Sequence, residues 1–124
     1  YYACQDIKNV KVLPFQMPQV PGYGTSNSVS LVVHAINEAR KNGIKVGLIR
    51  PITLWPFPVA PFKKAANQVK EIISVELSMG QMIEDVRLAC ECKVPVTLCS
   101  RTGGMIPSPD QVLEAINKAN GGAK

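Results

Sequence analysis

The chain has 124 residues, of which 46% are hydrophobic and 19% are charged, values typical of a single globular domain. A domain of this length buries about two-thirds of the surface of its unfolded chain, so it needs neither disulfides nor a metal ion to hold a core. The net charge of +5 comes from scattered lysines and arginines, whereas binding to a nucleic-acid backbone needs a dense basic stripe. No apolar run approaches the roughly 18 residues of a membrane span. We therefore expect neither a nucleic-acid partner nor a membrane partner.

Residues 1–21 follow no regular pattern. Val10 to Phe15 has the composition of a strand, but Pro14, Pro18 and Pro21 crowd the stretch, and proline cannot donate to a central ladder. We predict either an edge strand or irregular backbone here.

The first predicted helix covers residues 27–42, with Thr25 or Ser26 as its N-cap and Gly43 just past its end. His34, the only histidine, falls on the polar face, so we expect it to be solvated rather than a catalytic base or metal ligand. The apolar face repeats at i, i+3, i+4 and i+7, and its predicted buried residues are Val29, Val32, Val33 and Ile36.

Strands and helices then alternate, which predicts an α/β domain with a parallel sheet. The predicted strands cover 44–49, 70–76 and 94–100, and the predicted helices cover 58–68, 80–91 and the stretch from Pro109 to the glycines at 121–122. Ser108 and Gln111 have the spacing of a capping box for the last helix. The predicted buried faces of the last two helices are Met79, Met82, Ile83, Val86 and Cys90, and Val112, Leu113, Ile116 and Ala119.

The four cysteines match neither paired Cys-x-x-Cys motifs nor a ferredoxin cluster run. Cys90 falls on an apolar helix face and Cys99 in a strand, where cysteine acts as a small hydrophobic residue. Because the N-terminus has no secretory signal, we expect a cytoplasmic protein whose cysteines are reduced, metal-free and on buried faces. These cysteines are Cys4, Cys90, Cys92 and Cys99.

Parallel strands joined through helices bring their C-terminal ends, and the loops that follow, to one edge of the sheet. Polar, aromatic and glycine residues follow the predicted strands at this edge. They are the candidate interface or active-site-edge residues: Thr25, Ser26, Arg50, Trp55, Phe57, Glu76, Met79, Gly80, Gln81, Arg101, Gly103 and Gly104.

Each group of candidates has a structural alternative. Residues 22–26 suit either a phosphate cradle or a tight turn with an N-cap. Arg50 and Arg101 could bind an anion or pair with Glu76 or Asp85. Trp55, between prolines that hold an extended loop, is either an interface anchor or packed on its own core. We find no nucleophile elbow and no paired carboxylates suited to a metal, so we predict no catalytic, cofactor-binding or metal site in the chain.

Three strings carry a family resemblance. They are Ile44-Lys-Val-Gly-Leu-Ile-Arg-Pro-Ile-Thr-Leu-Trp-Pro-Phe-Pro58, Val75-Glu-Leu-Ser-Met-Gly-Gln-Met-Ile-Glu-Asp-Val-Arg87 and Arg101-Thr-Gly-Gly-Met-Ile-Pro-Ser-Pro109. In this order they resemble the C-terminal domain of the alpha subunit of 2-oxoacid:ferredoxin oxidoreductases of the 2-oxoglutarate or 2-oxoisovalerate type. The resemblance implies a three-layer α/β/α sandwich similar to the transketolase C-terminal domain, with a five-stranded, mostly parallel sheet and one antiparallel edge strand.

The resemblance also implies a function for a larger enzyme. Such an enzyme decarboxylates a 2-oxoacid on thiamine diphosphate with magnesium, passes electrons through iron–sulfur clusters to ferredoxin and forms an acyl-coenzyme A. The chain lacks the Gly-Asp-Gly and Asn-Asn pairs of the thiamine–metal motif. We therefore expect residues 1–124 to be one non-catalytic assembly domain and a fragment of a longer subunit. This domain should contact other domains and subunits in a hetero-oligomer. A dimer of the isolated domain is also possible.

Two alternatives remain open. One is the equivalent domain of a transketolase or of a 2-oxoacid dehydrogenase. The other is a free-standing α/β module that binds a phosphate or small molecule, supported by Gly24-Thr25-Ser26 alone.

Overall fold

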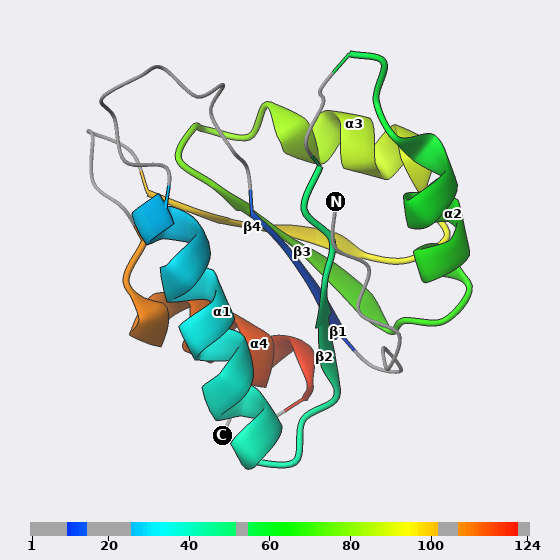
Figure 1. The fold of residues 1–124 in the computed structure, drawn as a ribbon. Helices are drawn as coiled ribbons and strands as arrows, with labels where there is room; N and C mark the ends of the chain where they lie inside the picture. The colour runs from blue at the N-terminus through cyan, green and yellow to red at the C-terminus, as the bar shows by residue number, and fades with distance from the viewer. Residues whose placement is uncertain (1–9, 15–25, 52–54, 102–106, 122–124) are drawn as a thin grey trace.

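The computed structural model describes residues 10–14, 26–51, 55–101 and 107–121 (Figure 1). Its elements are β1 (Val10–Pro14), α1 (Ser26–Lys41), β2 (Val46–Leu48), α2 (Val59–Ala66), β3 (Glu71–Glu76), α3 (Met82–Ala89), β4 (Val96–Ser100) and α4 (Pro109–Ala119). Helices α1 and α4 lie on one side of the sheet, and α2 and α3 lie on the other (Figure 1). The chain therefore folds as a three-layer α/β/α domain.

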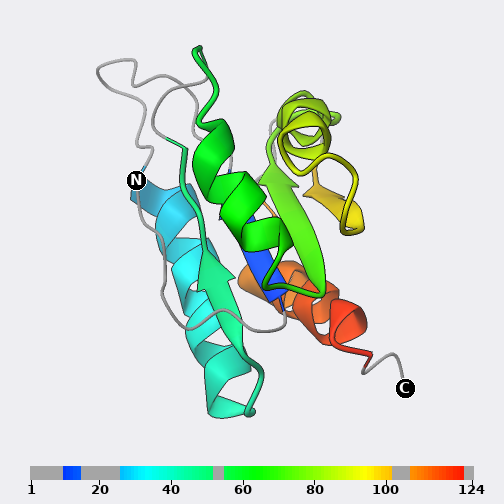
Figure 2. The ribbon, with the colours of Figure 1, turned by 90° about the vertical axis from the view of Figure 1, so that its right-hand side faces the viewer.

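The described strands form one parallel sheet in the order β2-β1-β3-β4. The arrowheads of β2 and β3 point the same way in Figure 2. All four strands therefore deliver their C-terminal ends to one edge, as the alternation of strands and helices predicted. The described residues contain four parallel strands and no antiparallel one, and the predicted fifth, antiparallel edge strand stays a prediction.

Strand β1 corrects the prediction made for residues 1–21. It pairs with β2 on one side and with β3 on the other, so an edge position is wrong for Val10–Pro14. Pro14 is the last residue of the strand, opposite Val75. A proline at that position removes a donor only where the ladder ends, which an interior strand tolerates. Pro18 and Pro21 lie outside the described residues.

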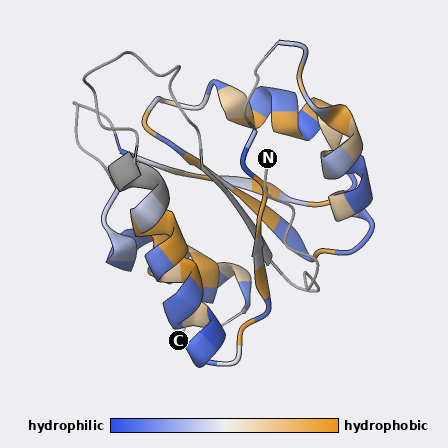
Figure 3. Ribbon diagram, viewed as in Figure 1, coloured by the Kyte–Doolittle hydropathy of each residue, from blue (hydrophilic) through white to orange (hydrophobic). Residues whose placement is uncertain are grey.

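Each face of the sheet carries its own apolar core. On the α1 and α4 face, Val32, Ala35 and Ile36 pack with Ile73 and Val75 of β3. The core on the α2 and α3 face contains Phe62, Ile72, Met82, Val86 and Val96. Hydrophobic residues gather on the sheet-facing sides of the helices (Figure 3). Burial of this kind is the main driving force for a fold of this type.

The predicted helix faces are right in part. On α1, Val32 and Ile36 are buried, but Val33 is 38% exposed, and Ala35 and Ala39 are buried instead, because the i, i+3, i+4, i+7 stripe that meets the sheet starts three residues later than predicted, at Val32. On α3, Met79 is 84% exposed since the helix begins only at Met82. Val29 belongs to a part of α1 whose side chains are not described.

Helix ends follow their local chemistry. Ser108 and Gln111 form the predicted capping box of α4, with Pro109 in the first turn. Gly43 ends α1 with a φ of +81°, the left-handed conformation that glycine adopts without steric cost. His34 is exposed, as predicted. No helix in the described ranges is both long and apolar enough to cross a bilayer.

Candidate functional site at the carboxyl edge of the sheet

The carboxyl edge is assembled by strand register. Glu76, the last residue of β3, lies opposite Ser100, the last residue of β4, and Arg101 follows directly. At β2, Arg50 follows the strand end by two residues. The topology therefore brings Arg50, Glu76 and Arg101 to the same edge, as the sequence predicted.

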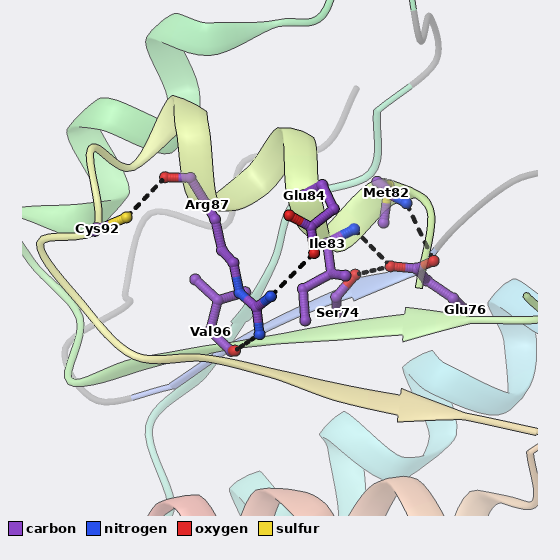
Figure 4. Close-up of polar contacts among 8 residues, drawn as sticks. All are labelled: Ser74, Glu76, Met82, Ile83, Glu84, Arg87, Cys92 and Val96. Atoms are coloured by element: carbon purple, nitrogen blue, oxygen red, sulfur yellow. Dashed lines mark hydrogen bonds and ion pairs between the residues drawn. The ribbon is translucent and has the colours of Figure 1, made fainter. Parts of the chain in front are cut away.

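Glu76 is the most tightly held polar side chain at this edge. It is fully buried, and its carboxylate accepts four hydrogen bonds. Oε1 accepts from the Ser74 hydroxyl and from the Ile83 backbone N–H, each at 2.7 Å. Oε2 accepts from the Ser78 hydroxyl at 3.0 Å and from the Met82 backbone N–H at 3.1 Å. Figure 4 shows the carboxylate turned toward the start of α3.

These bonds make Glu76 the cap of α3. The first N–H groups of a helix have no partner within the helix and favour a negative charge. Gln81 holds the N-cap position but makes no side-chain cap bond. The carboxylate of Glu76 replaces it from the end of β3, so the strand and the helix that follows are joined through one side chain.

The loop between β3 and α3 is shaped around this cap. Gly80 has a φ of +106°, and a Cβ there would lie 3.3 Å from side-chain atoms of both Ile83 and Leu98. A larger residue is therefore disfavoured by backbone strain and by contact. Met79, just before it, projects into solvent with 84% of its surface exposed. Gln81 is also exposed.

The loop after β2 carries the second exposed hydrophobic residue of the edge. Trp55 is 92% exposed, so it does not pack on the core of its own chain. Phe57 lies half-buried and stacks on the fully buried Phe62 of α2, with ring centroids 5.1 Å apart and planes at 27°. The stack fastens the loop two residues from Trp55.

Arg50 and Arg101 are both half-buried. All four described hydrogen bonds to Glu76 come from neutral donors, so within the described residues neither arginine pairs with this carboxylate, and pairing with Asp85 stays a prediction. Whether the two arginines bind an anion stays a prediction.

Three candidates fall outside the described residues: Thr25, Gly103 and Gly104. Ser26 begins α1 as its first residue, which excludes it as the N-cap. The phosphate-cradle alternative for residues 22–26 is therefore untested.

The cysteine prediction needs one correction. Cys90 is buried and Cys99 is half-buried, but Cys92 is exposed, because the chain turns outward after α3 with a φ of +54° at both Glu91 and Cys92. Burial raises the pKa of the Cys99 thiol. Within the described residues none of these three cysteines forms a disulfide, and Cys4 lies outside them. Within those residues, no three His, Cys, Asp or Glu side chains cluster in a way that could hold a metal ion.

A hollow that the sequence did not predict lies between α4 and strands β3 and β4. Its volume is about 470 Å³, and Leu98, Ala115, Lys118 and Glu71 are among its lining residues.

Away from the carboxyl edge, Arg87 donates to Glu84 at 3.1 Å and to the Val96 carbonyl at 3.4 Å (Figure 4). The hollow and the Arg87 contacts are separate from the Glu76 cap.

Residues 20–112 match the family model described as "Pyruvate:ferredoxin oxidoreductase core domain II". The chain belongs to this family. The resemblance drawn from the three strings is thereby confirmed.

Curated relatives agree with this family. The chain is 44% identical over 99 residues to the ketoisovalerate oxidoreductase subunit VorB of Methanothermobacter thermautotrophicus, a match that covers 80% of this chain and 27% of the relative. It is 34% identical over 85 residues to the 2-oxoglutarate synthase subunit KorA of Methanothermobacter marburgensis, covering 68% of this chain and 23% of the relative. This member of the domain II family thus spans about a quarter of the length of these relatives.

Solved structures share the fold. A 2-oxoglutarate:ferredoxin oxidoreductase from Magnetococcus marinus, solved with 2-oxoglutarate, coenzyme A and succinyl-CoA bound, superposes with a TM-score of 0.74 at 19% identity, over 94% of this chain and 18% of that one. A split-gene transketolase, described as an "inactive beta4 tetramer", superposes with a TM-score of 0.72 at 14% identity, over 94% of this chain and 40% of that one. The expected transketolase C-terminal-like fold is confirmed.

Proposed function

We propose that this domain is a non-catalytic assembly and subunit-contact domain of a thiamine-diphosphate-dependent 2-oxoacid:ferredoxin oxidoreductase. The whole enzyme converts a 2-oxoacid into an acyl-coenzyme A and reduces ferredoxin. Residues 1–124 form one domain of a longer subunit in this proposal. Family membership supports the enzyme class. Trp55 supports the contact role, because a tryptophan that is 92% exposed on a fastened loop is typical of an interface anchor.

The cofactors belong to other parts of the enzyme in this proposal. The chain has no thiamine–metal motif. The start of α3 already holds the Glu76 carboxylate, so it offers no place for a cofactor phosphate. Thiamine diphosphate, magnesium, iron–sulfur clusters and coenzyme A are therefore assigned to other domains and subunits. The same parts are the partners of this domain, in a cytoplasmic hetero-oligomer that reaches ferredoxin through the whole enzyme.

The test is Trp55→Ala in the subunit that contains this chain. A central aromatic anchor contributes about 2 kcal/mol or more, so the dissociation constant of the assembled enzyme should rise about 30-fold. The free energy of unfolding of the domain should change by less than about 1 kcal/mol, because the ring is exposed. Analytical ultracentrifugation measures the first quantity, and chemical denaturation measures the second.

Leu88→Ala is the matched control. Leu88 is 76% exposed, but it lies near the C-terminal end of α3, away from the carboxyl edge. It should leave assembly unchanged. Equal effects of the two variants, or no effect of Trp55→Ala, would overturn the contact role of Trp55.

A further inference from the structure

The β3–α3 loop combines an exposed apolar tip with a rigid base. Met79 is the tip, with 84% of its surface in solvent. Met79 lies at the same carboxyl edge as Trp55, because both follow the C-terminal ends of parallel strands. Methionine side chains adapt to irregular apolar surfaces, which makes them effective contact residues.

The base of the loop is the buried Glu76 carboxylate. It binds Ser78 inside the loop, and it binds Met82 and Ile83 directly after the loop. Ser74 donates to it from within β3 and fixes the direction of the carboxylate. Both ends of residues 77–81 are therefore fastened to one side chain.

We propose that Glu76 is a positioning residue, whose carboxylate holds the Leu77–Gln81 loop in the conformation that presents Met79 to an apolar pocket on another subunit of the enzyme. The inference rests on the proposed function, because it needs a partner at this edge. To the Trp55 contact it adds Met79 as a second anchor and Glu76 as the residue that orders the Met79 loop. A loop fixed before binding loses less conformational entropy on association, which strengthens the contact.

Gly80 is part of the same arrangement. Its φ of +106° turns the chain between Met79 and the helix, and the space around it is closed by Ile83 and Leu98. Gly80→Ala should therefore displace the loop while the Glu76 carboxylate is retained.

Glu76→Gln tests the positioning role. The glutamine side chain keeps the shape of glutamate but has only one acceptor oxygen. Its NH2 group therefore faces the backbone N–H of either Met82 or Ile83, and that hydrogen bond is lost. Hydrogen exchange at these amides in the subunit should accelerate about tenfold or more. Glu84→Gln is the matched control, because Glu84 lies on the same helix, is exposed and pairs only with Arg87 among the described residues.

Met79→Ala tests the presentation role without a risk to folding, because the side chain is exposed. We expect the dissociation constant of the assembled enzyme to rise about tenfold with Met79→Ala and with Glu76→Gln, and to stay constant with Glu84→Gln. If Glu76→Gln does not fold, Gly80→Ala replaces it as the variant that displaces the loop.

The outcomes separate this inference from the proposed function. Weaker assembly with Trp55→Ala but not with Met79→Ala would overturn the inference alone. Weaker assembly with Met79→Ala while the loop-displacing variant assembles normally, or unchanged exchange at Met82 and Ile83 in Glu76→Gln, would overturn the positioning role. Normal assembly of both Trp55→Ala and Met79→Ala would overturn the proposed function as well.

Discussion

The stack of Phe57 on Phe62 is predicted to hold the Trp55 loop on α2. Phe62 is fully buried, so Phe62→Ala should cost about 3–5 kcal/mol through lost burial and the cavity it leaves. Unfolding a chain of 124 residues changes the entropy by about 0.26 kcal/mol/K, so a loss of about 4 kcal/mol lowers Tm by about 15 °C. Phe57 is half-buried, and Phe57→Ala should cost about 2 kcal/mol, half of the loss expected for a fully buried phenylalanine.

A double-mutant cycle isolates the contact between the two rings. At a centroid distance of 5.1 Å, the coupling free energy should be about 0.5–1.5 kcal/mol. Urea denaturation followed by circular dichroism gives the four free energies of unfolding. Trp55 is the only tryptophan, so its fluorescence anisotropy reports the order of the loop and should fall in Phe57→Ala. A coupling below about 0.3 kcal/mol, with unchanged anisotropy, would refute the claim that the stack fastens this loop.

Two further predictions concern charge and thiols. The Lys63 ammonium, followed by Lys93, lowers the pKa of Glu91. The stability that this carboxylate contributes is therefore present above its ordinary pKa of 4.5 and is lost as pH falls through the lower, folded value. Denaturation of wild type and Glu91→Gln should differ at pH 6 and converge in acid; a difference that grows in acid would contradict the sign. Site-resolved alkylation of native protein at pH 8 should label exposed Cys92 at least about tenfold faster than Cys99, whose pKa is raised by burial, and equal rates would contradict this.

The sequence predicts those parts of the fold that depend on local pattern. Period-3.6 apolar residues locate α1 and α4, and the Ser108 capping box is visible because its two partners lie three residues apart. The interior position of β1 was not predictable in this way. Three prolines argue against a central strand, yet only Pro14 belongs to it, and it stands at the end of the ladder.

The candidate site shows the same division. The edge that collects Arg50, Glu76 and Arg101 follows from parallel topology alone. The capping role of Glu76 does not follow from topology. Its carboxylate oxygens accept from backbone amides six and seven residues further along the chain, a spacing that matches no capping motif. The exposure of Met79 depends on where α3 begins, and the helix begins only at Met82, two residues after Gly80 with its positive φ.

The filled start of α3 has a consequence for ligand selectivity. In many α/β proteins a helix start at the carboxyl edge of the sheet is where a phosphate group binds. Here the side chain of Glu76, a residue of the same chain, occupies that position and accepts from both amides. The Met82 and Ile83 amides are therefore already paired and are not open to a phosphate group from solution. Exchange of Glu76 for a small neutral residue would leave two backbone amides and two hydroxyls without this acceptor in a buried position, so it should destabilise the fold.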